Sequence, residues 1–467
     1  MQIIKKKGVF HLFSIVSIFI YAISISGCAN IIPPEGGPKD TLPPILVAAV
    51  PKDSTTLFKG DKITITFNEF VEIQNQSENV IFSPTATTLP IISAHLRTVS
   101  IKLKDTLEPN TTYSINFGNA IKDVNEGNVY KDFTYVFSTG ETIDDNSVTG
   151  KVTMAETGRI DSTLLVVLHR SNDDSAVVKE KPRYIAKIDG SGNFVFSHLP
   201  KGSFSIYAIP ANYSKHYEDT TKPFAFANKP INTTSNEPVT LFAYQLKKID
   251  TSAAKKQGKE ENKDMKIRIT NNLDQNRLDL LENPELTFNR RIATLDTSKI
   301  ILLNKDLKQL TDYKLVLDSS RTILTVQYKW QPASPYLLAI DSTALYDTSG
   351  IHLSRNDTLK FATKSTDEYG SIRIRFSNLD FSKNPVLQIV QNETIIEAVP
   401  LNDRELKRKL FRPGEYDLRI LYDSNKNGIW DSGIFFGKHI QPEIVLLLNT
   451  KLSVRANWDN EKEIILK

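Results

Sequence analysis

Residues 63–67 read Ile-Thr-Ile-Thr-Phe, and the strict alternation of apolar and polar side chains in this stretch decides the fold class. Successive side chains of a β-strand point to opposite faces of the sheet, so the two isoleucines and Phe67 share one face. Thr66-Phe67-Asn68 recurs as Thr287-Phe288-Asn289, at an offset of 221 residues. The sequence therefore predicts a half-buried strand that occurs twice in the chain.

Further matches at nearly the same offset extend this repeat well beyond one strand. Asn110-Thr111-Thr112-Tyr113 aligns with Ala333-Ser334-Pro335-Tyr336, and Phe137 aligns with Phe361. Offsets that differ so little indicate the same strand order with small changes in the loops. The two copies, residues 41–140 and 265–365, each have about the length of a seven-stranded β-sandwich.

A second pattern follows each copy. The stretch that begins at Gly202 and continues through Phe204 and Tyr207 matches the stretch that begins at Gly414, at an offset of 212 residues. Alternating runs rich in Val, Ile, Thr, Tyr and Phe, separated by turn residues, are typical of all-β sandwiches. We therefore expect an all-β chain of tandem β-sandwiches in two alternating, internally duplicated types, the second type at 146–245 and 369–467.

Three motifs of the first copy carry a resemblance to a known family. Thr66-Phe67-Asn68-Glu69, the Leu107–Tyr113 stretch and Tyr135-Val136-Phe137-Ser138-Thr139-Gly140 resemble the bacterial Ig-like domain first described in S-layer proteins. The second pattern resembles the transthyretin-like sandwich that accompanies carboxypeptidases as a regulatory domain. The Gly36–Pro44 stretch before the first copy is similar to a family of Bacteroidetes lipoproteins of largely undefined function.

The N-terminus has the order of features expected of an export signal. Lys5, Lys6 and Lys7 precede an apolar run that leads to Ile25-Ser26-Gly27-Cys28, which resembles the bacterial lipobox. The resemblance implies removal of residues 1–27 and lipidation of Cys28, palmitate included. Ala29 and Asn30 do not match the inner-membrane retention signal, so we expect an outer-membrane lipoprotein, with the periplasmic or cell-surface side left open. An uncleaved membrane anchor, or a cytosolic protein with an apolar N-terminus, is the alternative.

Two segments of the sequence read as connectors between modules. Residues 28–40 are rich in proline and glycine and form a tether after the lipid site, and residues 246–264 form a charged linker. Cys28 is the single cysteine of the chain, so no internal disulfide can form.

The composition gives no indication of nucleic-acid binding or of an enzyme. Lys and Arg number 58 against 54 Asp and Glu, and no basic run alternates with aromatic residues. The sequence contains no H-E-x-x-H, G-x-S-x-G, phosphate-binding or dinucleotide-binding motif. The sequence leaves open a catalytic pair of carboxylates that are distant in the sequence and come together only in the folded chain.

One loop has the spacing of a calcium site. Asp423, Asn425, Asn427 and Asp431 stand at positions 1, 3, 5 and 9, with glycine at position 6 and the backbone carbonyl of Ile429 at position 7. Ile434 takes the place of the usual glutamate at position 12, so a missing ligand must come from Glu443, another loop or water. The alternative is an Asx-rich turn held by its own hydrogen bonds. The first half has Ala211, Tyr213 and Lys215 at the corresponding positions, so a site would belong to the second half alone.

Three aromatic residues lie near this loop, namely Trp430, Phe435 and Phe436. They could form a patch that contacts sugar or protein, or they could be part of the core, and we favour the core.

The function that we expect is a non-catalytic, membrane-tethered adhesion, scaffold or assembly factor. Its partner would be an outer-membrane β-barrel complex, another envelope protein or a glycan. The alternative is a glycan-binding accessory protein of carbohydrate processing.

Overall fold

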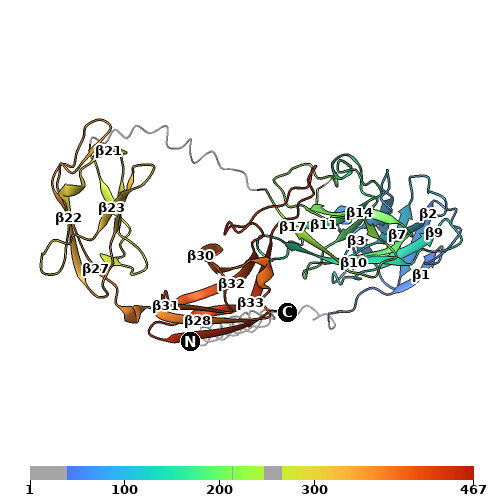
Figure 1. Cartoon of the computed structure of the whole chain (residues 1–467). Coiled ribbons are helices and arrows are strands. Elements are labelled where there is room, and N and C mark those ends of the chain that lie inside the picture. Colours follow the sequence, from blue (N-terminus) through green and yellow to red (C-terminus); the bar gives the residue numbers. More distant parts are fainter. Residues whose placement is uncertain (1–38, 213, 247–265, 467) are drawn as a thin grey trace, which may run out of the picture. The chain divides into compact units, whose positions relative to one another are not determined.

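The computed structural model describes residues 39–212, 214–246 and 266–466, which fold almost entirely as β-sheet (Figure 1). The helices are short, namely α2 (Gln76–Asn79), α3 (Ala176–Lys179) and the 3-10 helices η1 (Thr297–Lys299), η2 (Thr366–Glu368) and η3 (Phe381–Lys383). The prediction of tandem β-sandwiches is confirmed. The predicted signal peptide (1–27), Cys28 and most of the predicted tether and charged linker lie outside the described residues. No helix of the described ranges has the length and apolar character needed to cross a membrane.

The described chain divides into two compact units, one from most of residues 39–139 and one that includes residue 140 onward. The first unit holds most of the first Ig-like module, whose sheets have the orders β1-β2-β6-β5, β4-β7-β9 and β3-β8. Ile63, Ile65 and Phe67 of β2 are all buried, as their alternation predicts. The strands of this module are β1 (Leu46–Val50), β2 (Lys62–Phe67), β3 (Val71–Ile73), β4 (Ile81–Ser83), β5 (Ile91–His95), β6 (Thr98–Lys102), β7 (Thr112–Asn116), β8 (Ile121–Asp123) and β9 (Thr134–Ser138).

The second Ig-like module repeats this topology and adds one strand. Its sheets have the orders β18-β20-β24-β23, β19-β27-β25-β22 and β21-β26. The added strand β19 pairs in parallel with β27, and the first module has an isolated parallel bridge between Thr55 and Phe137 at the matching place. The strands are β18 (Ile269–Asn271), β19 (Arg277–Leu278), β20 (Glu285–Phe288), β21 (Ile292–Leu295), β22 (Ile300–Leu303), β23 (Lys314–Leu317), β24 (Ile323–Gln327), β25 (Pro335–Ile340), β26 (Leu345–Asp347) and β27 (Asp357–Thr363).

The second module type also occurs twice, and we call its two copies the first and second companion sandwiches. In the first, β13-β10-β17 faces β12-β11-β14-β15 across one core, and β16 pairs with β14. Its first strand pairs in parallel with its last, β10 with β17. The strands are β10 (Asn146–Met154), β11 (Leu164–His169), β12 (Tyr184–Lys187), β13 (Asn193–Leu199), β14 (Ser203–Pro210), β15 (Ala225–Phe226), β16 (Ile231–Asn232) and β17 (Val239–Ala243).

The second companion sandwich has the corresponding arrangement, with sheets β31-β28-β34 and β30-β29-β32-β33 and a parallel pair β28–β34. Because the two parallel pairs and the sheet orders correspond, the internal duplication extends to the strand pairing. The strands are β28 (Gly370–Ser377), β29 (Pro385–Gln391), β30 (Thr394–Pro400), β31 (Glu405–Phe411), β32 (Gly414–Tyr422), β33 (Ile444–Val454) and β34 (Asp459–Ile465).

Candidate functional site

The loop that connects β32 to β33 is built around the buried carboxylate of Asp423, which is 2% exposed. Its Oδ1 accepts from the backbone N–H of Lys426 at 2.6 Å and of Asn427 at 3.2 Å, and its Oδ2 accepts from that of Gly428 at 2.7 Å. Gly428 has a φ of +78°, which glycine adopts at little cost because it has no Cβ. The hydrogen bonds to Asp423 therefore hold residues 423–428 in a tight turn.

The other predicted ligand side chains meet at Asp431. Asn425 Nδ2 and Asn427 Nδ2 both donate to Asp431 Oδ2 at 2.7 Å. Glu443 closes the loop: its Oε1 accepts from Ser424 N at 2.7 Å, and its Oε2 accepts from Asp431 N at 3.1 Å. The structure thus brings the side chains of positions 3, 5 and 9 together and places Glu443 beside them.

These contacts bear directly on how a cation would bind. Asn425 Oδ1 and Asn427 Oδ1 accept from the backbone N–H groups of Asn427 and Ile429, at 3.0 and 2.8 Å, so the loop satisfies its own polar groups. Among the described residues, no three His, Cys, Asp or Glu side chains are grouped so that they could hold a metal ion. A calcium ion would have to use the amide oxygens and displace hydrogen bonds of the turn. Calcium binding by this loop therefore stays a prediction.

The three aromatic residues near the loop have different environments. Trp430 is partly buried against Val386 and Val445, and its Nε1 donates to Glu443 O at 2.7 Å. Phe435 is 4% exposed and lies in a cluster with aromatic residues of the first companion sandwich, whereas Phe436 is 43% exposed. Phe435 is therefore a packing residue, and Phe436 alone of the three presents a largely exposed ring.

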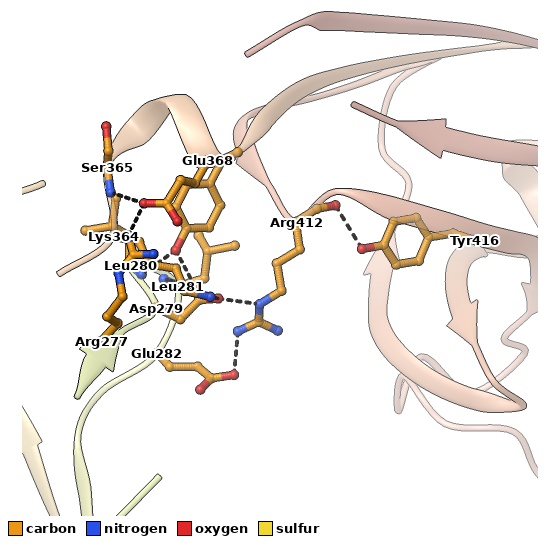
Figure 2. A network of polar contacts seen from close by, with 11 residues as sticks. Arg277, Asp279, Leu280, Leu281, Glu282, Lys364, Ser365, Glu368, Arg412 and Tyr416 are labelled. Carbon is orange, nitrogen blue, oxygen red and sulfur yellow. Dashed lines mark hydrogen bonds and ion pairs between the residues drawn. The ribbon is translucent and has the colours of Figure 1, made fainter. Parts of the chain in front are cut away.

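A polar network that the sequence did not indicate joins the second Ig-like module to the second companion sandwich (Figure 2). Arg412 Nε donates to Asp279 Oδ2 at 2.9 Å, and Arg412 Nη2 also pairs with Glu282. The Tyr369 hydroxyl donates to Asp279 Oδ1 at 2.8 Å and accepts from Leu280 N at 2.8 Å. One guanidinium of the companion sandwich is thereby fixed to two carboxylates of the Ig-like module.

Burial and hydrogen bonding oppose each other at this junction. Burial raises the pKa of Asp279, but the hydrogen bonds from Arg412, Leu281 and Tyr369 outweigh it and hold the pKa below its ordinary value. Burial raises the pKa of Tyr369, so its hydroxyl stays protonated and can donate. At the offsets of the internal repeat, Asp279 corresponds to Phe58 of the first half and Arg412 corresponds to Pro200. The first half therefore lacks both charged side chains.

A hollow of about 470 Å³ lies beside the Asp423 loop. The apolar side chains of Phe381, Val386 and Leu401 line it together with polar groups of Asn402 and Lys426. This volume falls in the range of small-molecule sites, about 300 to 1,000 Å³, although the hollow is open to solvent.

Comparison with known proteins gives a family for one module. A family model described as a bacterial Ig-like domain matches residues 40–139. No curated protein matches the chain. The chain is similar to the TIE protein of Bacillus anthracis, with 13% identity, 93% of this chain and 76% of that chain covered, and a TM-score of 0.17. It is also similar to BcpA, the major pilin subunit of Bacillus cereus, with 12% identity, 69% and 99% coverage and a TM-score of 0.16. The S-layer protein rSbsC matches at 11% identity, with 90% and 54% coverage and a TM-score of 0.16. Similarity at this level bears on neither the function nor the partners of this chain.

Proposed function

We propose that the protein is a lipid-anchored, non-catalytic scaffold or adhesion protein of the bacterial envelope. The observation that carries the proposal is the duplicated string of β-sandwiches, in which the polar network around Arg412 and Asp279 joins two modules (Figure 2). A chain built in this way presents several sheet edges and loops, and such surfaces bind extended segments of other proteins.

Anchoring at Cys28 would concentrate these modules at a membrane surface. Each buried CH₂ of an acyl chain contributes about 0.8 kcal/mol, so several chains on one cysteine make attachment effectively permanent. We propose the outer membrane, because Ala29 and Asn30 follow the cysteine. The companion sandwiches would then be transthyretin-like accessory modules, as their sequence resemblance suggests.

The test is affinity purification of the tagged, lipidated protein from detergent-solubilised membranes. We expect one envelope or outer-membrane protein to co-purify in stoichiometric amount. The matched control is Cys28→Ser, which keeps the modules but removes the anchor. Absence of any specific partner across several growth conditions would count against a scaffold.

The hollow beside the Asp423 loop favours a second candidate, a glycan-binding accessory protein. It combines apolar walls with the donors of Asn402 and Lys426, and the exposed ring of Phe436 belongs to the same long loop. A glycan array of the full chain tests this candidate. Saturable binding that Lys426→Ala weakens, and that Lys438→Ala leaves unchanged, would favour it over the scaffold.

A further inference from the structure

The two companion sandwiches contact each other although the second Ig-like module separates them in the sequence. The contact is made by residues 432–442 of the second sandwich, which we call the plug, and by an aromatic surface of the first, which we call the socket. Phe435 of the plug lies 5.5 Å from Tyr207, 5.1 Å from Phe224 and 4.9 Å from Phe226, measured between ring centroids. Burial of one aromatic ring against three others is the kind of anchor that dominates an interface.

Polar contacts surround this anchor. His439 stacks on Phe435 and places its Nε2 2.7 Å from Asp174 Oδ1 of the first sandwich. Gln441 Nε2 donates to Phe226 O at 3.0 Å and to Asn228 Oδ1 at 2.8 Å. An aromatic centre with a hydrogen-bonded polar rim is the anatomy of a specific protein interface.

The backbones of the two sandwiches also approach closely. Val445 N donates to Ala155 O at 2.8 Å, directly beyond the plug. A Cβ at Gly433 would lie 2.7 Å from the Tyr244 ring, and one at Gly158 would lie 2.8 Å from Leu447 N. Glycine at these two positions is therefore what allows the contact to close.

The plug is held in shape by its own module. Both of its ends are tied through Glu443, whose carboxylate accepts from Asp431 N at 3.1 Å and whose carbonyl accepts from Trp430 Nε1 at 2.7 Å. A segment ordered before it docks loses less conformational entropy on binding, so more of the contact energy is available for closure.

The duplicated modules have diverged in a complementary way. Tyr207 of the socket pairs with Val167 across β14 and β11, whereas the corresponding cross-strand pair of the second sandwich is Arg419 and Gln388. The second sandwich thus replaces the apolar floor of a socket with two buried polar side chains. Glu393 joins the modules here, with its carboxylate 2.7 Å from Arg159 of the first sandwich and 3.8 Å from Arg419. One copy supplies the socket and the other the plug, so a single chain carries both halves of the contact.

We infer that the plug and socket form a latch that closes this chain on itself, with the chain's own second companion sandwich as the partner of the first. Closure in cis is favoured because both surfaces belong to one chain, which gives the plug a high effective concentration at the socket. Phe435, and the socket around Tyr207 and Phe226, are covered in the closed form. An outside partner could reach them only after the latch opens.

Thiol cross-linking in the full mature chain tests the latch. Cys28→Ser removes the single cysteine, and Asp173→Cys with Lys438→Cys places one thiol beside each member of the Asp174–His439 contact. A short bismaleimide should link the two thiols within one chain, at a rate that does not depend on protein concentration. The control pair, Asp173→Cys with Glu463→Cys on β34, should react only slowly.

Two neighbouring aromatic residues provide the matched variants. Phe435→Ala should slow the cross-link at least about tenfold, because a buried phenylalanine is lost, while exposed Phe436→Ala should change the rate less than about twofold. Hydrogen exchange shows whether Phe435→Ala remains folded, since β34 should keep its protection while Val445 N–H exchanges faster. If β34 also loses protection, the surface variant Arg159→Glu takes its place and should slow the cross-link too.

Three results would overturn the inference. The first is a rate for the Asp173–Lys438 pair no faster than for the control pair. The second is linkage between different chains that rises with concentration, which would make the socket a site for a second copy. The third is a folded Phe435→Ala protein that cross-links as fast as the parent.

Discussion

Replacing Arg412 by alanine should uncouple the second companion sandwich from the second Ig-like module. The guanidinium donates to Asp279 at 2.9 Å and also pairs with Glu282. Without it, the Asp279 carboxylate, whose side chain is 13% exposed, keeps the Tyr369 hydroxyl and Leu281 N–H as donors, with the Lys364 ammonium 3.9 Å away. The carboxylate loses its strongest partner but keeps two hydrogen-bond donors.

The magnitude follows from these contacts. A hydrogen bond to a charged group contributes about 1.5 to 3 kcal/mol where it is buried. The Arg412 side chain is 42% exposed, so solvent screening reduces the expected loss to about 1 to 2 kcal/mol. For a cooperative unit of about 200 residues this corresponds to a fall of about 2 to 8 °C in melting temperature.

The loss of stability caused by Arg412→Ala should also depend on pH. The fold holds the pKa of Asp279 below its ordinary value of 3.8. Its stabilisation is therefore present above pH 3.8 and is lost as the pH falls through the lower pKa of the folded state. Arg412→Ala removes part of that stabilisation, so the difference between parent and variant should narrow below about pH 4.

Differential scanning calorimetry of the mature Cys28→Ser chain measures both effects. In the parent we expect the second Ig-like module and the second companion sandwich to unfold in one shared transition, and in Arg412→Ala in two. Arg408→Ala is the matched control, because Arg408 pairs with Glu397 at 3.1 Å inside one module with similar exposure. A single transition in Arg412→Ala, shifted no further than in Arg408→Ala, would refute a coupling role for the junction.

Four other perturbations have defined outcomes. Burial, and then the charge of His216, lower the pKa of His169 from 6.5 to about 4. The resulting contribution of about 3 kcal/mol to stability is present above pH 6.5 and is lost as the pH falls from 6.5 toward 4. An acid titration that shows no loss of stability for the first companion sandwich in that window would contradict this. Asp423→Ala leaves the backbone N–H groups of Lys426 and Gly428 without their acceptor, whereas that of Asn427 keeps Asn425 Oδ1, and the change should destabilise the second companion sandwich by about 2 kcal/mol or more. Calcium at about 10⁻³ M should raise the melting point of the parent and not of this variant, and equal melting with calcium and with chelator in both would leave the loop a simple turn. Cys28→Ser should release the protein from the membrane fraction or leave it unprocessed, and normal processing with unchanged membrane retention would rule out lipidation.

Some features of the loop could be predicted from the sequence and others could not. The D-x-N-x-N-G spacing predicted a tight turn with convergent oxygen side chains, and the structure shows Asn425, Asn427 and Asp431 together. The sequence does not say whether these groups bond to one another or to a cation, because the same atoms serve both arrangements. The proximity of Glu443 also depends on where β33 begins, which no local pattern indicates.

The sequence by itself determined the features that repeat at short range. The alternation of Ile63, Ile65 and Phe67 defined a buried strand face, and the matching offsets of Phe288 and Phe361 defined a duplicated chain of sandwiches. The tertiary structure decided which surfaces meet. Arg412 bonds to Asp279, which is 133 positions away in the sequence. Phe435 packs against Tyr207, which is still more distant in the sequence. Each of these residues is ordinary in its local sequence, and its role arises because docking brings a complementary charge or an aromatic ring within reach. Strand periodicity is a property of neighbouring residues, whereas the energy of a contact between modules exists only once both surfaces have folded.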